Sequence, residues 1–523
     1  MEKHVSLFLC VIPKHSVNVP PLSLGFLQGA CKKHGVKVQI RDFNFDLWKK
    51  TIFTEKWNDI WLETNQTLFK GEEFKNFCKE LYDEEIQSWA KEIASTDHTH
   101  VGISCFSHRS LPTFKKLATA LKKLDSNKII IAGGAPMTQY GKWIVDSGLA
   151  DYVVISEGEE VLADIVKGKY KPGVIQTKQI DNLDSIPIPD YTGLDITQYT
   201  GGSPVGDQVR NPKYRKRNEL AIIGSRGCVR KCTFCDVEAY WPKFRWRSAK
   251  NIFNEMMHYK QKYGIDRFFF YDSLVNGNTK QFEELLDLII EAGSPFKGLQ
   301  GLAIFKRMPE RIFEKMRKAR WHSMIIGVES FSEEVRDHMR KKFSNQIMDE
   351  NLQYYKKYKI NLVLLMIVGY PGELEKHHKE NYEWMKNNRH YAGNPIRQIE
   401  VGTTMLIFPG SPVFYENMFE YFVDDKGDWV VIHNGETNDM SVRKARRKDL
   451  VRWAEEFGLG TESVYGTGGQ LVGDVEDRDI VNKIHKLENS TDLKLEDEYV
   501  KQSLGWESDP TRPLHSHWHD KLD

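Results

Sequence analysis

The chain has 523 residues, of which 40% are hydrophobic, so it is long enough for two or three domains that each bury a core. Its 74 lysine and arginine residues nearly balance its 73 aspartate and glutamate residues, so no overall field draws it to nucleic acid or to anionic lipid. The apolar runs are no longer than strands, and the first of them lacks the features of a signal peptide. We therefore expect a cytoplasmic protein with no membrane or nucleic-acid partner and with seven reduced cysteines.

The first part of the chain, residues 1–168, alternates short apolar runs with amphipathic stretches, which predicts a parallel sheet covered by helices. An aromatic and charged segment, Phe45–Ile93, is expected to be a helical insertion. Two turns, at Gly133-Gly134 and at Glu157-Gly158-Glu159, follow strands on the side where doubly wound sheets bind ligands. The predicted strands are Val5–Ile12, Val36–Arg41, Val101–Cys105, Lys128–Ala132 and Tyr152–Ile155.

Residues 169–216 are irregular and contain several prolines and glycines, which is typical of a linker. Residues 217–425 again alternate strands and helices, and six such units predict an open, partial barrel. Residues 426–523 are more polar and less periodic, and we expect them to form a C-terminal extension. The predicted barrel strands are Leu220–Gly224, Arg267–Tyr271, Leu299–Ile304, His322–Val328, Asn361–Val368 and Ile399–Phe408. The predicted helices are Ala249–Tyr263, Lys280–Ala292, Glu310–Lys318 and Glu373–Asn387.

Three cysteines lie within eight residues directly after the first strand of the second domain, at Cys228, Cys232 and Cys235. Soft thiolate ligands favour iron-sulfur clusters or zinc, and a closed zinc site needs a fourth ligand. No fourth cysteine follows downstream. Three thiolates on a cubane leave one iron open, which suits catalysis, so we favour a cluster. The alternative is a zinc knuckle that a histidine completes.

Two groups of basic residues accompany this motif or follow it. Arg226, Arg230 and Lys231 flank the cysteines and are expected to favour thiolates over thiols. A second basic run lies in the C-terminal part of the chain and is expected to form a solvated helix face. Its members are Arg443, Lys444, Arg446, Arg447 and Lys448.

The cysteine loop, with the aromatic Phe234 before its last cysteine, resembles the signature of the radical S-adenosylmethionine (SAM) superfamily. Asp272 resembles the polar end of the second barrel strand, near the methionine part of the cofactor, although the usual Gly-Gly-Glu is absent. Glu329 resembles the acidic residue that reaches the ribose hydroxyls, and Gly369 lies in a segment similar to the one near the adenine. Phe408–Pro412 looks like the loop that closes the sixth unit.

Each of these secondary matches also has a structural interpretation. Pro371-Gly372 and Pro409-Gly410 are ordinary turn dipeptides. Glu329 could be a carboxylate at a helix N-terminus, and Asp272 could cap the stretch that follows it. Their order at successive strand ends favours a site, because barrel enzymes collect active-site residues at those ends.

The resemblance implies a 4Fe-4S cluster whose open iron binds SAM, so that one electron yields a 5'-deoxyadenosyl radical. It also implies an electron donor such as flavodoxin or ferredoxin and a small-molecule or peptide substrate. The protein would orient the cofactor and exclude water. The sequence identifies no catalytic residue beyond the cofactor ligands.

Residues 1–168 are similar to the cobalamin-binding domain that is fused to many radical SAM enzymes. The match includes Pro20–Gly25, Ile40–Asp42 and Ser156–Glu160, together with Gly133 and Gly134 as cofactor-binding residues. The resemblance implies an α/β protein with an N-terminal Rossmann-like domain of the cobalamin-binding type, a partial (βα)6 radical SAM barrel and a C-terminal α+β extension. Cobalamin is a further candidate cofactor, and the absence of a D-x-H-x-x-G motif indicates no lower histidine ligand to cobalt.

Such fused enzymes often transfer a methyl group, which favours a methyltransferase. Three alternatives remain open: a radical SAM oxidoreductase or rearrangement enzyme with a degenerate N-terminal domain, a Rossmann-like domain that only packs on the barrel, and a non-catalytic zinc-binding module. A methylthiotransferase is disfavoured, because those enzymes use a second three-cysteine cluster. The remaining cysteines, Cys10, Cys31, Cys78 and Cys105, are scattered and are expected to be small core residues.

Overall fold

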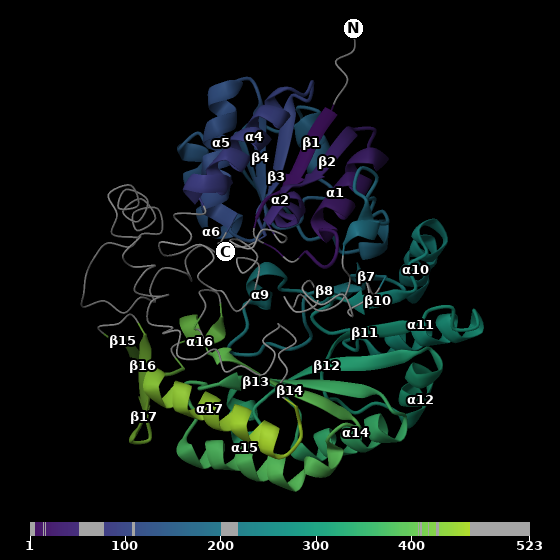
Figure 1. Cartoon of the computed structure of the whole chain (residues 1–523), viewed down its shortest axis with the longest axis vertical. Coiled ribbons are helices and arrows are strands. Elements are labelled where there is room, and N and C mark those ends of the chain that lie inside the picture. The colour runs from purple at the N-terminus through teal and green to yellow at the C-terminus, as the bar shows by residue number, and fades with distance from the viewer. Residues whose placement is uncertain are drawn as a thin grey trace. The chain divides into compact units, whose positions relative to one another are not determined.

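A computed structural model describes residues 6–13, 15, 17–51, 78–106, 110–199, 218–405, 407, 411–416, 418–424 and 428–460 (Figure 1). The described residues up to Tyr199 belong to one compact unit, and those from Asn218 onward belong to a second. In these ranges no helix combines the length and the apolar character that a membrane span requires.

The N-terminal unit is a six-stranded parallel sheet in the order β2-β1-β3-β4-β5-β6, which confirms the Rossmann-like α/β prediction. The chain adds β2 on one side of β1 and then places β3 on the other side, so the direction in which strands are added reverses. The carboxyl ends of β1 and β3 therefore form the switch point of the sheet. The strands are β1 Ser6–Val11, β2 Lys37–Asp42, β3 His100–Ser104, β4 Ile129–Gly133, β5 Tyr152–Ile155 and β6 Gly173–Gln176. The helices are α1 Leu22–Lys33, α2 Phe43–Thr51, α4 Asp83–Ala94, α5 Leu111–Leu124, α6 Met137–Asp146 and α7 Leu162–Val166.

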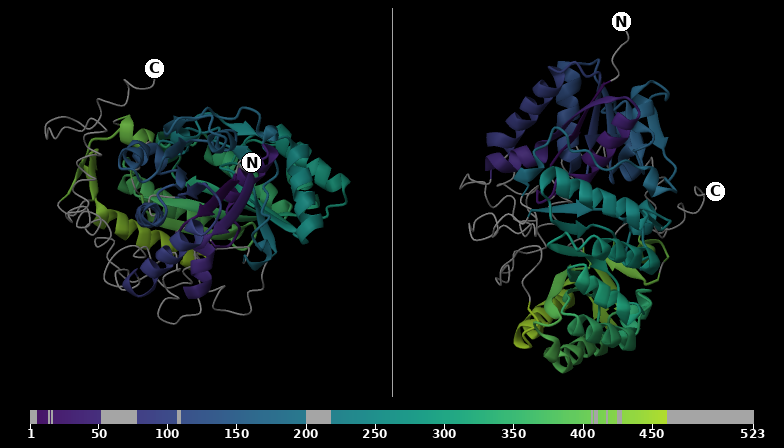
Figure 2. Two further views of the ribbon diagram at one scale, coloured as in Figure 1. Left: turned by 90° about the horizontal axis from the view of Figure 1, so that it is seen from above. Right: turned by 90° about the vertical axis from the view of Figure 1, so that its right-hand side faces the viewer.

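Strand β1 shows why this sheet is covered on both faces. All six of its residues are buried: Phe8 and Cys10 join one core, while Leu7, Leu9 and Val11 join the other. An apolar strand without polar alternation is typical of a parallel sheet between two helix layers. The first core includes residues of α2, α4, α5 and α6, and the second includes residues of α1 and α7. Figure 2 shows helices on both sides of the N-terminal strands.

The predicted N-terminal strands all form, with ends that shift by at most one residue. The linker prediction for residues 169–216 missed β6, a strand of four residues whose one partner among the described strands is β5. Its alternate residues are exposed, so it lacks the apolar run that marked the other strands. The predicted insertion contributes α2, the π-helix η3 (Cys78–Tyr82) and α4, and its residues 52–77 lie outside the described ranges.

The second unit is a six-stranded parallel sheet in the order β14-β13-β12-β11-β10-β7. Each strand after β7 adds beside its predecessor, and β7 and β14 do not pair, so the barrel is partial, as predicted. Figure 1 shows its helices in succession along one side of this sheet. The strands are β7 Glu219–Ile222, β10 Arg267–Phe270, β11 Gly298–Ala303, β12 Trp321–Glu329, β13 Asn361–Val368 and β14 Ile396–Thr404. The helices are α10 Ala249–Tyr263, α11 Thr279–Glu291, α12 Glu310–Lys318, α13 Glu333–His338, α14 Asn345–Lys357 and α15 Glu375–Asn387.

The second unit also contains smaller elements. A two-stranded antiparallel pair, β8 (Ser225–Arg226) and β9 (Arg245–Trp246), brackets the cysteine loop and the short helix α9 (Val237–Tyr240). The C-terminal extension forms an antiparallel sheet followed by a helix, as the α+β prediction requires. The sheet begins with β15 Tyr421–Val423, which lies before the predicted boundary at residue 426, and continues with β16 Trp429–His433 and β17 Glu436–Asn438. The helix is α17 Met440–Glu456. Residues 461–523 of the predicted extension lie outside the described ranges.

The turn after β4 depends on the glycine at position 134. Gly134 has a φ of +113°, and a Cβ atom there would lie 1.9 Å from the carbonyl oxygen of Cys105. We expect Gly134→Ala to destabilise the N-terminal unit by more than about 3 kcal/mol, because the clash is with backbone. In calorimetry of the full chain, the unfolding temperature of the N-terminal unit should fall, and that of the second unit should not change.

Gly168→Ala is the matched control for this prediction. Gly168 also has a positive φ, +74°, but a Cβ atom there would meet nothing within 4 Å. The Gly168→Ala substitution should lower the free energy of unfolding by only about 1 kcal/mol, through backbone strain. Equal shifts in the two variants would contradict a steric role for the Cys105 carbonyl.

Candidate active site at the cysteine loop

The three cysteines occupy the loop between β8 and α9, above the carboxyl end of β7. Cys232 is buried, and Cys228 and Cys235 are half-buried. The backbone N–H of Arg230 donates to Cys228 Sγ at 3.3 Å, and Cys235 N donates to the carbonyl of Cys232 at 3.1 Å. The described ranges hold no group of three His, Cys, Asp or Glu side chains arranged around a single ion. A cubane binds each thiolate to a different iron, so its ligands need not converge on one point.

Thr233 fastens this loop to three other strand-end segments. Its N–H donates to the carbonyl of Met339 at 3.2 Å, and its carbonyl accepts from Val413 N at 2.7 Å. Its hydroxyl lies 2.8 Å from the hydroxyl of Tyr370, which donates to the carbonyl of His338 at 3.1 Å. These partners follow β12, β13 and β14. The cysteine loop is therefore tied to the end of α13, to the turn after β13 and to a segment beyond β14.

Asp272 lies just after β10 and supports the start of the cysteine loop. One carboxylate oxygen accepts from Gly224 N at 3.0 Å and the other from the Ser225 hydroxyl at 2.5 Å. Burial raises the pKa of Asp272 to about 6. These contacts show a positioning role, and its predicted contact with the methionine part of SAM stays a prediction.

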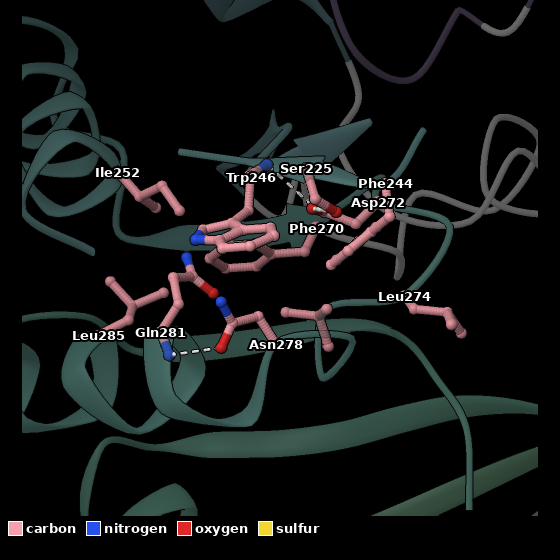
Figure 3. A pocket seen from close by; sticks show the side chains of 12 residues that line it. Ser225, Phe244, Trp246, Ile252, Phe270, Asp272, Leu274, Asn278, Gln281 and Leu285 are labelled. Atoms are coloured by element: carbon pink, nitrogen blue, oxygen red, sulfur yellow. Dashed lines mark hydrogen bonds between the residues drawn. The ribbon is translucent and has the colours of Figure 1, made fainter. Parts of the chain in front are cut away.

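Figure 3 shows a cavity beside Asp272, between the β8–β9 pair, β10 and α11. Its volume of about 10 Å³ corresponds to roughly one water molecule. Trp246 and Phe270 form much of its wall, and the Ser225–Asp272 hydrogen bond lies at one side. The cavity is therefore a packing gap beside Ser225 and Asp272 and is too small for a cofactor.

Glu329 ends β12 in a conformation that few residues other than glycine adopt. Its φ is +68°, and the pairing with β13 shifts register between Gly327 and Glu329. Such irregularities redirect a side chain at a strand end. The buried carboxylate accepts a hydrogen bond from Lys341 Nζ at 3.0 Å. The ion pair with Lys341 accounts for the buried carboxylate of Glu329, so a role at a helix N-terminus is not needed to explain this carboxylate.

Lys341 is a site residue that the sequence reasoning missed. It is 5% exposed, and its ammonium lies 5.7 Å from the centroid of the Phe234 ring. Burial opposes its charge, but Glu329, Cys232 and Cys228 together raise the pKa of Lys341 above its usual value. In the sequence it stands between Arg340 and Lys342 and has the pattern of a surface charge run. No local signal distinguishes it.

As expected, Arg230 lowers the pKa of the Cys228 and Cys232 thiols, but burial has the larger effect and leaves the pKa of all three thiols raised. Burial raises the pKa of Cys232 and of Cys235 to about 11 and outweighs the opposing effect of Lys341. Lys231 instead pairs with Glu238. Bound iron must therefore displace the thiol protons, as is usual for thiolate ligands.

Gly369 begins the turn after β13 and packs against the C-terminal extension. It has a φ of +75°, and a Cβ atom there would lie 2.3 Å from Cγ of Arg443. Its N–H donates to Glu373 Oε2 at 2.9 Å, and the carbonyl of Tyr370 accepts from Asn438 Nδ2 at 2.9 Å. Burial raises the pKa of Glu373 to about 6. The predicted turn at Pro371-Gly372 forms, and its approach to adenine stays a prediction.

The prediction that the basic run of α17 is a solvated face is wrong for two of its members. Arg443 is fully buried, lies 3.7 Å above the Trp429 ring and donates to the Trp429 carbonyl at 2.9 Å. Arg446 is also buried and donates to the carbonyl of Glu373 at 2.8 Å. The sequence could not show this, because α17 packs on elements distant in the chain. Phe408–Gly410 of the predicted closing loop lie outside the described ranges.

In the N-terminal unit, the predicted cofactor-binding residues lie at the carboxyl edge of the sheet. Gly133 ends β4, and Gly134 follows it. Packing against Cys105 explains the glycine at 134, so ligand binding by the pair stays a prediction. Glu157 has a structural contact, because it accepts from Ile180 N at 2.6 Å. Asp42 at the end of β2 accepts from the hydroxyl of Tyr199 at 2.8 Å.

Two family models match the chain. Residues 222–385 match the Radical SAM superfamily, and residues 74–166 match the B12 binding domain. The first match begins in β7 and includes the three cysteines, Asp272, Glu329 and Gly369. The second includes β3, β4 and β5 with Gly133 and Gly134.

Curated relatives are distant. The chain is 23% identical to cytidylyl-2-hydroxyethylphosphonate methyltransferase of Streptomyces wedmorensis over 74% of this chain and 77% of that protein. It is 24% identical to an uncharacterized methyltransferase of Pyrococcus horikoshii over 54% of this chain and 63% of that protein. It is 22% identical to an anaerobic magnesium-protoporphyrin IX monomethyl ester cyclase of Synechocystis over 44% of this chain and 48% of the cyclase.

Two solved structures share most of the architecture. The radical SAM methyltransferase TsrM of Kitasatospora setae, solved with tryptophan and a SAM analog, covers 86% of this chain and is itself covered to 89%, with 14% identity and a TM-score of 0.59. The cobalamin-dependent radical enzyme OxsB, solved with aqua-cobalamin and SAM, covers 86% of this chain and is covered to 66%, with 14% identity and a TM-score of 0.59. At these identities the likeness establishes the fold.

The cysteine loop, the parallel sheet that carries it and the two family matches lead to one assignment. Residues 222–385 form a domain of the radical SAM superfamily and residues 74–166 form a B12 binding domain, and these two domains support a 4Fe-4S cluster, S-adenosylmethionine and cobalamin as cofactors.

Proposed function

We propose that this protein is a cobalamin-dependent radical SAM methyltransferase whose cluster is held by Cys228, Cys232 and Cys235. The observation that carries the proposal is the cysteine loop itself, which Thr233 ties to segments that follow β12, β13 and β14. The B12 binding domain in the same chain favours methyl transfer among radical SAM reactions. The likeness to two methyltransferases supports the same choice.

In this proposal, the chain's residues bind and orient the cofactors and exclude water. The three thiolates ligate three irons and leave the fourth open to SAM. Glu329 and Gly369 lie at the ends of β12 and β13, where they would orient the ribose and the adenine. When bound, the cluster and SAM supply a 5'-deoxyadenosyl radical, and cobalamin supplies a carrier for the methyl group.

The substrate in this proposal is a small molecule or a peptide, and the electron donor is a flavodoxin or a ferredoxin. The relative from Streptomyces wedmorensis is named for a cytidylyl phosphonate, which is consistent with a small polar substrate. The magnesium-protoporphyrin cyclases are the second candidate class, since three of them show 22% or 23% identity to this chain.

The arrangement of the other cysteines disfavours a methylthiotransferase, although two relatives of that class match. Cys10 and Cys105 lie in one core of the N-terminal sheet, and Cys31 lies in the other. Burial raises the pKa of Cys31 to about 12. The described cysteines of the N-terminal unit are therefore core residues, as predicted, and do not form a second cluster site. The side chain of Cys78 lies outside the description.

Anaerobic reconstitution with iron, sulfide and cobalamin, followed by SAM and a reductant, tests the proposal. We expect one 4Fe-4S cluster, retained cobalamin, and conversion of SAM to both 5'-deoxyadenosine and S-adenosylhomocysteine. Deoxyadenosine without S-adenosylhomocysteine or methylated product, in the presence of bound cobalamin and candidate substrates, would favour the cyclase class. A single tightly bound zinc would overturn the cluster assignment.

The role of the cysteines can be tested one residue at a time. We expect Cys232→Ala to abolish cluster assembly and to lower 5'-deoxyadenosine formation by more than about 1000-fold, because an incomplete ligand set cannot hold the cubane. Iron analysis, visible absorbance and chromatography of deoxyadenosine measure the two effects. The N-terminal unit should still fold and bind cobalamin.

Cys31→Ala is the matched control, since Cys31 is also a buried cysteine but lies in the N-terminal core. It should retain the cluster and lose at most about 1–2 kcal/mol of stability. Deoxyadenosine formation that persists in Cys232→Ala would contradict the assignment.

A further inference from the structure

A buried cation lies next to the cysteine loop without a role in the proposed function. Lys341 Nζ donates to Glu329 Oε1 at 3.0 Å and lies 5.7 Å from the centroid of Phe234, the residue before Cys235. The lysine is 5% exposed, so water screens its charge poorly. A fixed positive charge therefore faces the place where the cluster would be held.

The backbone around Lys341 selects this one side chain from three consecutive basic residues. Arg340 and Lys342 both have left-handed φ values, +57° and +55°, which are costly for residues other than glycine. The Arg340 side chain turns to Glu416, with Nη1 2.9 Å from Oε1. Lys341 N donates to the carbonyl of Arg336 at 2.9 Å and anchors the segment to α13. The strained turn thus places only the middle residue in the interior.

The charges near the thiols come from few groups. Lys341 interacts electrostatically with Cys228, Cys232 and Cys235. Arg230 is the other cation coupled to Cys228 and Cys232. The anions are Glu329, which is coupled to Cys232, and Asp236, which is coupled to Cys235. Lys341 and Glu329 therefore oppose each other at Cys232.

We propose that Lys341 raises the reduction potential of the cluster held by Cys228, Cys232 and Cys235, and that Glu329 limits this rise. Reduction adds one negative charge to the cluster, and a nearby buried cation stabilises the reduced form more than the oxidised form. The electron comes from the external one-electron donor. The inference rests on the cluster and on its three ligands, and it does not depend on methyl transfer.

The competing explanation is that Lys341 only neutralises Glu329 and packs on Phe234. Under that explanation, removal of Lys341 and removal of Glu329 both disturb the structure, and the two variants change the cluster potential in a similar way. Under the proposal, their effects on the potential have opposite signs. Lys341→Met should lower the potential, Glu329→Gln should raise it, and Lys341→Arg should leave it near the wild-type value.

Redox titration of the reconstituted cluster with mediator dyes, without SAM, measures the reduction potential in each variant. The fraction of reduced cluster is followed by electron paramagnetic resonance, and iron and sulfide are quantified in each variant. For a unit charge near the cluster in a medium of effective dielectric about 20, we expect on the order of a tenfold change in the ratio of reduced to oxidised cluster at fixed potential. Tenfold corresponds to about 59 mV for a one-electron couple.

Lys341→Met leaves a buried carboxylate unpaired, which can prevent folding. A second comparison avoids this problem, because the Glu329→Gln single variant and the Glu329→Gln, Lys341→Met double variant both lack the carboxylate. The double variant should have the lower potential of the two. Equal potentials in these two variants, with equal iron content, would overturn the proposal and leave the cluster intact. Wild-type protein that assembles no cluster would overturn the cluster assignment instead.

Discussion

The site depends on parallel strand pairing, because only parallel strands bring all their carboxyl ends to one edge. In the second sheet, the cysteine loop comes after β7, Asp272 and Gly369 follow β10 and β13, and Glu329 ends β12. Thr233 turns this proximity into a fixed geometry, since its backbone and its hydroxyl reach partners after three other strands. The position of the thiols is therefore set by long-range contacts as well as by the loop's own sequence.

Several ionisable groups around this edge are buried, and each has a specific partner. Asp272 binds the start of the cysteine loop, Glu373 binds the turn after β13, and Glu329 binds Lys341. An unpartnered buried charge would cost several kcal/mol, so these pairings constrain where each loop can lie. The same burial that raises the pKa of Asp272 and Glu373 to about 6 strengthens electrostatic effects on any bound cofactor.

Sequence patterns predicted the architecture well, because strand and helix periodicity is local. Helices α10 and α12 begin and end at the predicted residues, and five N-terminal strands shift by at most one residue. Strand β6 escaped prediction, because four alternating residues at a sheet edge carry little apolar signal. Lys341 and Arg443 escaped it for another reason. Both belong to basic runs in sequence, and only tertiary packing shows which members of each run are buried.

The C-terminal extension shows how an open barrel can complete its own site. A partial barrel leaves β14 with one unpaired edge, and unpaired strand edges need cover. The extension supplies it: Ile399 N donates to the Leu459 carbonyl at 3.1 Å, and Arg447 Nε donates to the Gly402 carbonyl at 2.9 Å. The same helix carries Arg443 and Arg446, which pack on the turn from Gly369 to Glu373. Because one helix satisfies the sheet edge and supports that turn, loosening α17 at either place should disturb the other. The geometry of the turn is thus coupled to a part of the chain that contributes no predicted cofactor ligand.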